Sequence, residues 1–217
     1  QPDPGTPDAQ ESRGLGDVYK RQEEDLQKYA MFASNAERPQ SANPVSSKLP
    51  LKLEEKDRIA LIGNTLFDRM RDFGHFEALL QQAHPDMNLI VRNLAWSADE
   101  IDLQPRPDNF ADTEQHLTAM KADIIIAAFG FNESFGGKKE LPSFETRLAN
   151  YLLIFRSKSY NGKSAHSVIL VSPIANENVQ GVQAADRNNP NIKAYCKSMF
   201  LRVVSGVIGT IKGSVAS

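Results

Sequence analysis

Short aliphatic runs alternate with amphipathic stretches through the middle of the chain. Four runs stand out, RIALIG at 58–63, NLIVRNL at 88–94, DIIIAAFG at 123–130 and SVILVS at 167–172. Each is rich in Ile, Val and Leu and is typical of a strand buried on both faces of a parallel sheet. Strands that alternate with helices favour right-handed crossover connections. The pattern therefore predicts an α/β fold built as a three-layer α/β/α sandwich.

The stretches between these runs have helical spacing and recognisable helix boundaries. After the first run, apolar residues recur every three or four positions, and we expect Gly74 to break that helix. Asp112 is expected to cap a short helix before the third run, and Ser143 to cap a longer helix after it. Asn189 and Pro190 are expected to be the N-cap and the first residue of a last helix.

The ends of the chain differ in composition from this middle part. Residues 1–22 have no apolar period and end in DVYKRQ, which resembles the translation of a transposon end used in sequencing libraries. We interpret them as a disordered leader and a sequencing-adapter artefact. Residues 23–50 are expected to be a flexible linker, residues 51–199 an incomplete folded domain, and residues 200–217 an anomalous cationic tail.

The last segment, FLRVVSGVIGTIKGSVAS, has two interpretations. No Asp or Glu follows Asp186, although basic residues continue to the end of the chain. The segment is either the end of a truncated or chimeric domain, which we favour, or a genuine Val- and Ile-rich fifth strand.

Composition and charge limit the partners of the chain. It has 217 residues, of which 25 are basic and 27 acidic, so it can bury one ordinary core and has no bias toward nucleic acid. Its apolar runs are too short to span a bilayer, and the single Cys196 cannot form an internal disulfide. We therefore expect no nucleic-acid partner and no membrane-spanning segment, and we leave other domains and export of a parent protein open.

The residues that follow each run are the candidates for function, because ligand sites of parallel sheets lie at the carboxyl ends of the strands. The first three runs are followed by GNT at 63–65, WSADE at 96–100 and FGFNESF at 129–135. These blocks resemble those of the SGNH or GDSL-type hydrolases, a superfamily of esterases and lipases, and look closest to a bacterial subgroup with Gly-Asn-Ser/Thr in its first block. The resemblance covers about residues 56–199. It implies a flavodoxin-like parallel sheet with strand order 2-1-3-4, its fifth strand missing or replaced.

The resemblance also implies roles for individual residues. Thr65 stands at the nucleophile position, Ala98 at a glycine whose backbone N–H binds an oxyanion, and Asn132 at an asparagine whose side chain does the same. Further residues of the blocks would line the site of a small-molecule ester; these are Gly63, Asn64, Ser97, Gly130 and Glu133. We expect no metal and no cofactor, since no pair of ligands has metal spacing and no Gly-rich phosphate loop follows a strand.

Each catalytic assignment has a structural alternative. Thr65 precedes a helical pattern, so its hydroxyl is equally suited to cap that helix, and its β-methyl makes it a more crowded nucleophile than serine. Asn132 is also a typical turn residue. Ala98 replaces a glycine, and a positive φ there would cost about 1–2 kcal/mol.

The resemblance implies a catalytic base that the sequence does not supply. The family provides it as Asp-x-x-His near the C-terminus, and no such block exists here. The four histidines, His75, His84, His116 and His166, are expected at surface or packing positions.

SPIANENV at 172–179 is expected to be a solvated loop, with Asn176 and Glu177 at the rim of a pocket as the alternative. We therefore expect an SGNH-type hydrolase of carbohydrate or other small acyl esters with impaired activity. The alternative is a catalytically silent domain that binds a ligand or carbohydrate.

Overall fold

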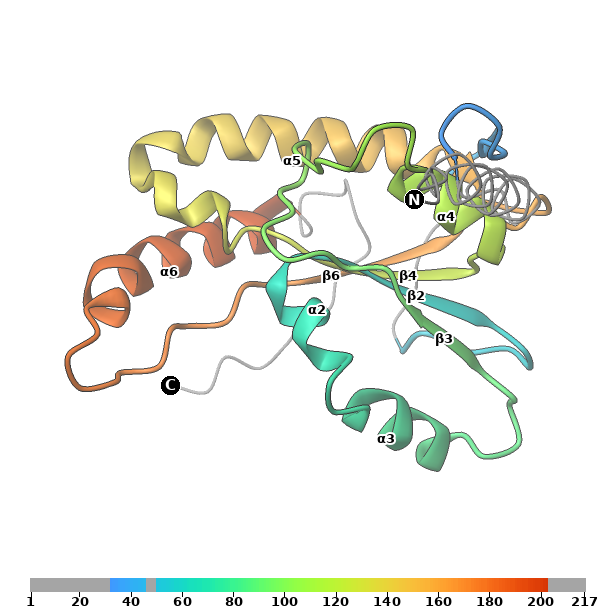
Figure 1. Cartoon of the computed structure of the whole chain (residues 1–217), viewed down its shortest axis with the longest axis horizontal. Helices are drawn as coiled ribbons and strands as arrows, with labels where there is room; N and C mark the ends of the chain where they lie inside the picture. Colours follow the sequence, from blue (N-terminus) through green and yellow to red (C-terminus); the bar gives the residue numbers. More distant parts are fainter. Residues whose placement is uncertain (1–31, 46–49, 203–217) are drawn as a thin grey trace, which may run out of the picture.

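The structure is a computed structural model that describes residues 32–45 and 50–202 (Figure 1). Its main elements alternate between strand and helix along the chain. In chain order they are β1 (Gln40–Ser41), β2 (Arg58–Gly63), α2 (Thr65–Met70), α3 (His75–Ala83), β3 (Ile90–Asn93), α4 (Thr113–Met120), β4 (Ile124–Ala128), the 3-10 helices η1 (Glu133–Gly136) and η2 (Lys138–Glu140), α5 (Leu141–Arg156), β5 (Lys158–Ser159), β6 (Ser167–Val171) and α6 (Ala184–Arg202).

Four parallel strands form the central sheet in the order β3-β2-β4-β6. Strand β2 lies inside the sheet, where Ile59 is in register with Val91 of β3 and with Ile124 of β4. All four predicted runs are strands, and the predicted order 2-1-3-4 is confirmed. The expectation about a fifth strand concerns residues 200–217, of which 203–217 lie outside the described residues, as does the expected leader at 1–22.

Alternate side chains of the sheet face two different cores. On one face, Ala60 and Ile62 of β2 are buried with side chains of α4, α5 and α6. On the other face, Ile59 and Leu61 are buried with Phe67 of α2 and with partly buried side chains of α3. Figure 1 shows α4 and α5 on one side of the sheet and α2 and α3 on the other. The predicted α/β/α sandwich is therefore confirmed, because runs apolar at every position supply both cores.

Two of the predicted helix boundaries are confirmed. The Asp112 carboxylate accepts a hydrogen bond of 2.9 Å from the Gln115 N–H, and the Gln115 side chain accepts one of 3.1 Å from the Asp112 N–H. This reciprocal pair is a capping box at the start of α4. Gly74 separates α2 from α3 with a φ of 62°, a conformation that glycine adopts without a steric cost.

The start of α5 differs from the prediction. The helix begins at Leu141, so Ser143 lies in its first turn and is not the N-cap. Pro142 takes an early helical position, where a missing N–H costs no hydrogen bond because the first turn has free N–H groups anyway. The chain therefore enters this helix two residues before the first residue with a capping side chain.

The start of α6 was also predicted wrongly. The helix begins at Ala184, which places Pro190 inside it. Asn189 does not cap it; the Asn189 side chain accepts a hydrogen bond of 2.7 Å from the Asn176 N–H and donates one of 3.0 Å to the Asn176 carbonyl. A tertiary contact with the segment after β6 thus uses the side chain that the sequence suggested as a cap.

Part of the expected flexible linker lies against the domain. Phe32 forms an isolated antiparallel bridge with Phe110, and β1 pairs antiparallel with β5. The Gln115 side chain donates hydrogen bonds of 3.1 and 2.9 Å to the carbonyls of Ala33 and Ala36. Residues 32–45 therefore differ from the free linker that their composition predicts, because backbone pairing holds them without an apolar period. Among the described residues, no helix has both the length and the apolar character that crossing a membrane requires.

The buried side chain of His166 makes the stability of the fold depend on pH. It precedes β6 at the amino end of the sheet, is only 2% exposed, and donates from Nδ1 to the Lys158 carbonyl at 3.1 Å. Burial lowers the pKa of His166 to about 4 from its ordinary value of 6.5. The folded chain therefore keeps this imidazole neutral at pH values where the unfolded chain protonates it.

We expect this histidine to make the free energy of unfolding fall as the pH decreases from about 6.5 to about 4, because in this range the unfolded chain binds a proton that the folded chain does not. The loss is about 3 kcal/mol. Urea titrations at several pH values should show a flatter dependence in His166→Phe than in the wild type. His75→Gln, which changes an exposed histidine of α3, is the control and should follow the wild type. Equal slopes in wild type and His166→Phe would contradict this account.

Candidate active site

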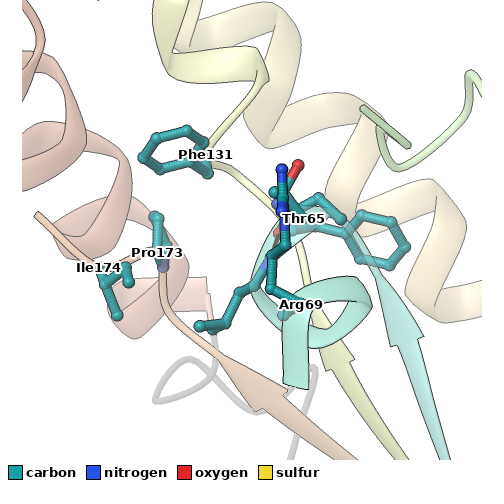
Figure 2. Close-up of a pocket in the computed structure, with 9 residues that line it drawn as sticks. Thr65, Arg69, Phe131, Pro173 and Ile174 are labelled. Atoms are coloured by element: carbon teal, nitrogen blue, oxygen red, sulfur yellow. Dashed lines mark hydrogen bonds between the residues drawn. The ribbon is translucent and has the colours of Figure 1, made fainter. Parts of the chain in front are cut away.

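A pocket of about 250 Å³ opens at the carboxyl ends of β2 and β4. Figure 2 shows Thr65 and Arg69 of α2 on one side, Pro173 and Ile174 of the segment after β6 on the other, and Phe131 of the segment after β4 beside them. The pocket is thus built from three segments that the parallel sheet brings together. Its lining residues are Asn64, Thr65, Leu66, Arg69, Ala128, Phe129, Phe131, Pro173 and Ile174.

Gly63 allows the end of β2 to lie directly against the end of β4. Its φ is +119°, and a Cβ placed on it would lie 2.1 Å from the Ala128 carbonyl oxygen. The next residue, Asn64, donates its N–H to the same oxygen at 3.2 Å. Any side chain at position 63 would force the two strands apart, so this glycine is needed for the backbone and does not line the pocket itself.

Asn64, and not Thr65, is the N-cap of α2. Its Oδ1 accepts a hydrogen bond of 3.2 Å from the Leu66 N–H, which is the bond expected of a capping side chain. The interpretation of Thr65 as the cap is therefore wrong. The Thr65 hydroxyl makes no hydrogen bond within the described part of the chain, and Thr65 lines the pocket.

Asn64 also leaves a donor without a partner. The side chain is 2% exposed, and its Nδ2 is buried with no acceptor among the described residues. Such a group loses its hydrogen bonds to water without replacement, at a cost of about 1–3 kcal/mol. Asn64 also lines the pocket, and the binding role expected for it stays a prediction.

Ala98 has the left-handed backbone conformation of the glycine that it replaces. Its φ is 68°, and its side chain is exposed and outside the pocket lining. Ala95, a buried alanine three residues earlier, does not have a positive φ. Among residues 95–100, Ala98 is therefore the only one with a positive φ.

A buried ion pair fixes the loop that carries Ala98. Two nitrogens of Arg106 donate to the two carboxylate oxygens of Asp99 at 2.8 and 2.7 Å, and the two side chains are 8% and 4% exposed. The Arg106 guanidinium also stacks on the Trp96 ring at 4.6 Å. The sequence carries no signal for this pair, since six residues of irregular chain lie between its members and no periodicity marks it.

Asn132 is hydrogen-bonded to the same loop. Its Nδ2 donates to the Asp99 carbonyl at 3.0 Å, and the residue does not line the pocket. An amide group has two N–H donors, so one remains after this bond. The hydrogen bond places Asn132 next to the residue that follows Ala98, and the oxyanion role of both residues stays a prediction.

Glu133 is buried and bonded to the backbone of two loops, and the binding role expected for it stays a prediction. It is 5% exposed, and its carboxylate accepts hydrogen bonds from the Gly130 N–H at 2.8 Å and the Ile101 N–H at 3.0 Å. Burial raises its pKa, while these backbone bonds act in the opposite direction. The side chain therefore faces the interior, where it connects the loops after β3 and β4.

Ser97 and Gly130 also lie outside the pocket lining. The exposed Ser97 hydroxyl donates to the Asp68 carboxylate. Gly130 has a φ of +94°, and a Cβ on it would come within 3.1 Å of the Met199 sulfur. The binding roles expected for both residues stay predictions.

No histidine of the chain lines the pocket, although all four lie within the described residues. His75 begins α3, His84 follows that helix, His116 lies on α4, and His166 precedes β6 at the opposite end of the sheet. Among the described residues, no group of three or more His, Cys, Asp and Glu side chains is arranged to hold a metal ion. The site therefore has a hydroxyl and amide donors but no imidazole.

The wall formed by Phe131, Pro173 and Ile174 was not assigned from the sequence. Pro173 and Ile174 belong to SPIANENV, which was expected to be a solvated loop. Its Asn176 is bound by Asn189, whereas the side chain of Glu177 is exposed and outside the pocket lining. The apolar run into Pro173 was the one available signal.

Ala98→Gly is expected to raise the free energy of unfolding by about 1 kcal/mol, because glycine adopts a positive φ without the clash that a Cβ causes. Urea denaturation checks this value. The matched control is Ala95→Gly, a buried alanine without a positive φ, which should instead destabilise the chain. Destabilisation by Ala98→Gly of the same size as by Ala95→Gly would refute the backbone argument.

Glu133→Gln is expected to lower the free energy of unfolding by about 1–3 kcal/mol. In the wild type both carboxylate oxygens accept from a backbone N–H, whereas in the variant the amide N–H₂ would face one of these N–H groups and leave it without an acceptor. Glu140→Gln, an exposed change at the end of η2, serves as the control. Thermal and urea unfolding of the three proteins gives the comparison. A wild-type stability of Glu133→Gln would show that the carboxylate does not hold the two loops.

The comparisons with known proteins concern the fold. No protein-family model matches the sequence, and no curated protein matches it. The structure is similar to that of Axe2, an acetyl xylan esterase from Geobacillus stearothermophilus, with a TM-score of 0.51, 18% identity, and coverage of 71% of this chain and 75% of that one. It is also similar to a gut microbial diltiazem-metabolizing enzyme, with a TM-score of 0.53, 14% identity, and coverage of 75% of this chain and 37% of that one.

These identities are too low to carry a function or a site residue from one protein to another. The two likenesses concern the α/β fold alone. The fold that the resemblance to the SGNH hydrolases implies is therefore confirmed.

Proposed function

We propose that the pocket beside Thr65 is an ester-hydrolysing site of the SGNH type, with Thr65 as its nucleophile. One observation carries the proposal: Asn64 caps α2, so the Thr65 hydroxyl is free of that task and lies at the pocket wall. The position follows directly after β2, at the sheet edge where parallel α/β folds bind their ligands. A hydroxyl at this place can attack a bound acyl group.

Three donors would stabilise the tetrahedral intermediate. The family resemblance assigns the backbone N–H of Ala98 and the side chain of Asn132 to the oxyanion. The hydrogen bond from Asn132 to the Asp99 carbonyl supports this assignment, since it links the loops after β3 and β4. The second N–H of the Asn132 amide can then donate to an oxyanion. The backbone N–H of Thr65, in the first turn of α2, is the third donor. Donors held in place before the reaction stabilise developing charge without reorganisation.

The proposed reaction has two stages. Thr65 Oγ attacks the ester carbonyl carbon and its proton passes to water, because no histidine lines the pocket. The alkoxide then leaves and takes up a proton to become the alcohol, with the acyl group bound to Thr65. Water adds to the acyl carbon, which releases the carboxylic acid and restores the hydroxyl.

We expect slow ester hydrolysis because no imidazole lines the pocket. A positioned general base contributes about 10²–10⁴-fold, and the β-methyl of threonine further crowds the attacking oxygen. We therefore propose that the chain as given turns over activated esters slowly. Oxygen esters of carbohydrates or other small acyl esters are the proposed substrates, in line with the fold shared with an acetyl xylan esterase.

A second candidate function is a silent binding domain. The observation that favours it is the same absence of a histidine from the pocket of Thr65. Such a domain would keep the pocket and bind an ester without attacking it. The two candidates differ in whether the Thr65 oxygen forms a covalent bond.

The deciding experiment is covalent labelling with an activated phosphonate, read by mass spectrometry of the peptide that contains Thr65. We expect slow labelling of the wild type on Thr65, none in Thr65→Ala, and faster labelling in Thr65→Ser, which lacks the crowding methyl group. Asn132→Ala should slow the labelling about 10²-fold, the usual effect of removing one oxyanion donor. Thr146→Ala, a change on the exposed face of α5, is the control.

Release of p-nitrophenol from its acetate ester is measured on the same proteins. Turnover close to that of Thr65→Ala, together with no labelled Thr65, would reject the hydrolase and leave the binding domain. Fast wild-type turnover that disappears in Thr65→Ala would instead contradict the conclusion that the pocket lacks a base.

A further inference from the structure

Arg69 is the one ionisable side chain among the nine residues that line the pocket. Six of the others are apolar residues, namely Leu66, Ala128, Phe129, Phe131, Pro173 and Ile174. Arg69 itself is exposed, so its guanidinium stands at the open rim of an apolar cavity. A cation in such surroundings attracts an anion more strongly than one that is fully solvated.

Arg69 has no anionic partner within the described part of the chain. Its guanidinium makes no hydrogen bond and no ion pair there. Arg71, two residues further on, shows the contrast, since it pairs with Asp68 and donates to the Ala95 carbonyl. Arg38, Arg106 and Arg147 pair with carboxylates as well. Among the described residues nothing neutralises the Arg69 guanidinium, which can therefore pair with an anionic group of a bound molecule.

The position of Arg69 relative to Thr65 fixes where that anion would lie. Both residues belong to α2 and are four positions apart, so they lie on the same helix face with Cβ atoms about 5–6 Å from each other. Figure 2 shows both on the side of the pocket that faces Pro173 and Ile174. A molecule that runs from Thr65 to Arg69 therefore lies along α2, with Pro173 and Ile174 on its other side.

We propose that this pocket accepts a short acyl chain that ends in a carboxylate, with the carbonyl at Thr65 and the carboxylate on Arg69. The inference rests on the proposed function and names its substrate class as half-esters of short dicarboxylic acids. The planar guanidinium matches a carboxylate with two parallel hydrogen bonds, and the apolar wall covers the methylene groups between the two ends. A cavity of about 250 Å³ offers more room than an acetyl group fills.

The test measures binding, so it does not depend on turnover. The probes are monomethyl glutarate and methyl valerate, which have acyl chains of equal length and differ by the terminal carboxylate. Chemical-shift titrations of the whole chain give both dissociation constants. We expect the wild type to bind monomethyl glutarate about fivefold more tightly, a preference of the size that a partly exposed ion pair supports and that should shrink at high salt.

Variants separate the charge of Arg69 from its packing. Arg69→Gln should lose the preference, Arg69→Lys should keep most of it, and Arg92→Gln on β3, an exposed arginine outside the pocket lining, should keep all of it. Thr65→Ala should also keep it, since binding the carboxylate does not need the hydroxyl. Equal affinities of the wild type for the two probes, or a preference that survives in Arg69→Gln, would overturn the inference. Labelling of Thr65 would still stand in that case, so failure of the substrate class and failure of the hydrolase are distinguishable.

Discussion

The arrangement of the site depends on the hydrogen bonds between the buried Glu133 carboxylate and the backbone. Two backbone N–H groups from different loops, those of Gly130 and Ile101, donate to its two oxygens. Removing a carboxylate from water costs free energy, as its raised pKa reflects, and the two donors offset part of that cost. Because the Asn132 side chain also binds the Asp99 carbonyl, the loops after β3 and β4 are held as one unit.

Residues 63–65, which follow β2, are joined to these loops by backbone contacts and not by an ion pair. The absence of a side chain at Gly63 lets β2 end against Ala128 of β4, and the Asn64 N–H binds the Ala128 carbonyl. With Asn64 as the cap, α2 does not depend on the hydroxyl at position 65. The fold therefore leaves Thr65 available for chemistry and makes the residue at this position a matter of reactivity, not of helix stability.

The sequence predicts the sheet better than it predicts the helix boundaries or the pocket. The four strands and their order follow from buried aliphatic runs and from the motif resemblance. The blocks at the strand ends name Thr65, Ala98 and Asn132 as site residues, and their roles stay predictions. Ser143 and Asn189 mislead because tertiary contacts override local capping preferences. The Asp99–Arg106 pair and the wall at Pro173 have no local signal, since folding alone brings their members together.

The crystal structure of the chain phosphonylated on Thr65 tests the central claim most directly, because it shows whether the three blocks form one oxyanion site. The account predicts a phosphonyl oxygen at hydrogen-bond distance, about 2.7–3.1 Å, from the Ala98 N–H nitrogen and from Asn132 Nδ2. It also predicts that the Glu133 carboxylate keeps its bonds to Gly130 and Ile101. A phosphonyl oxygen directed to solvent, with Ala98 and Asn132 beyond hydrogen-bond distance, would contradict it.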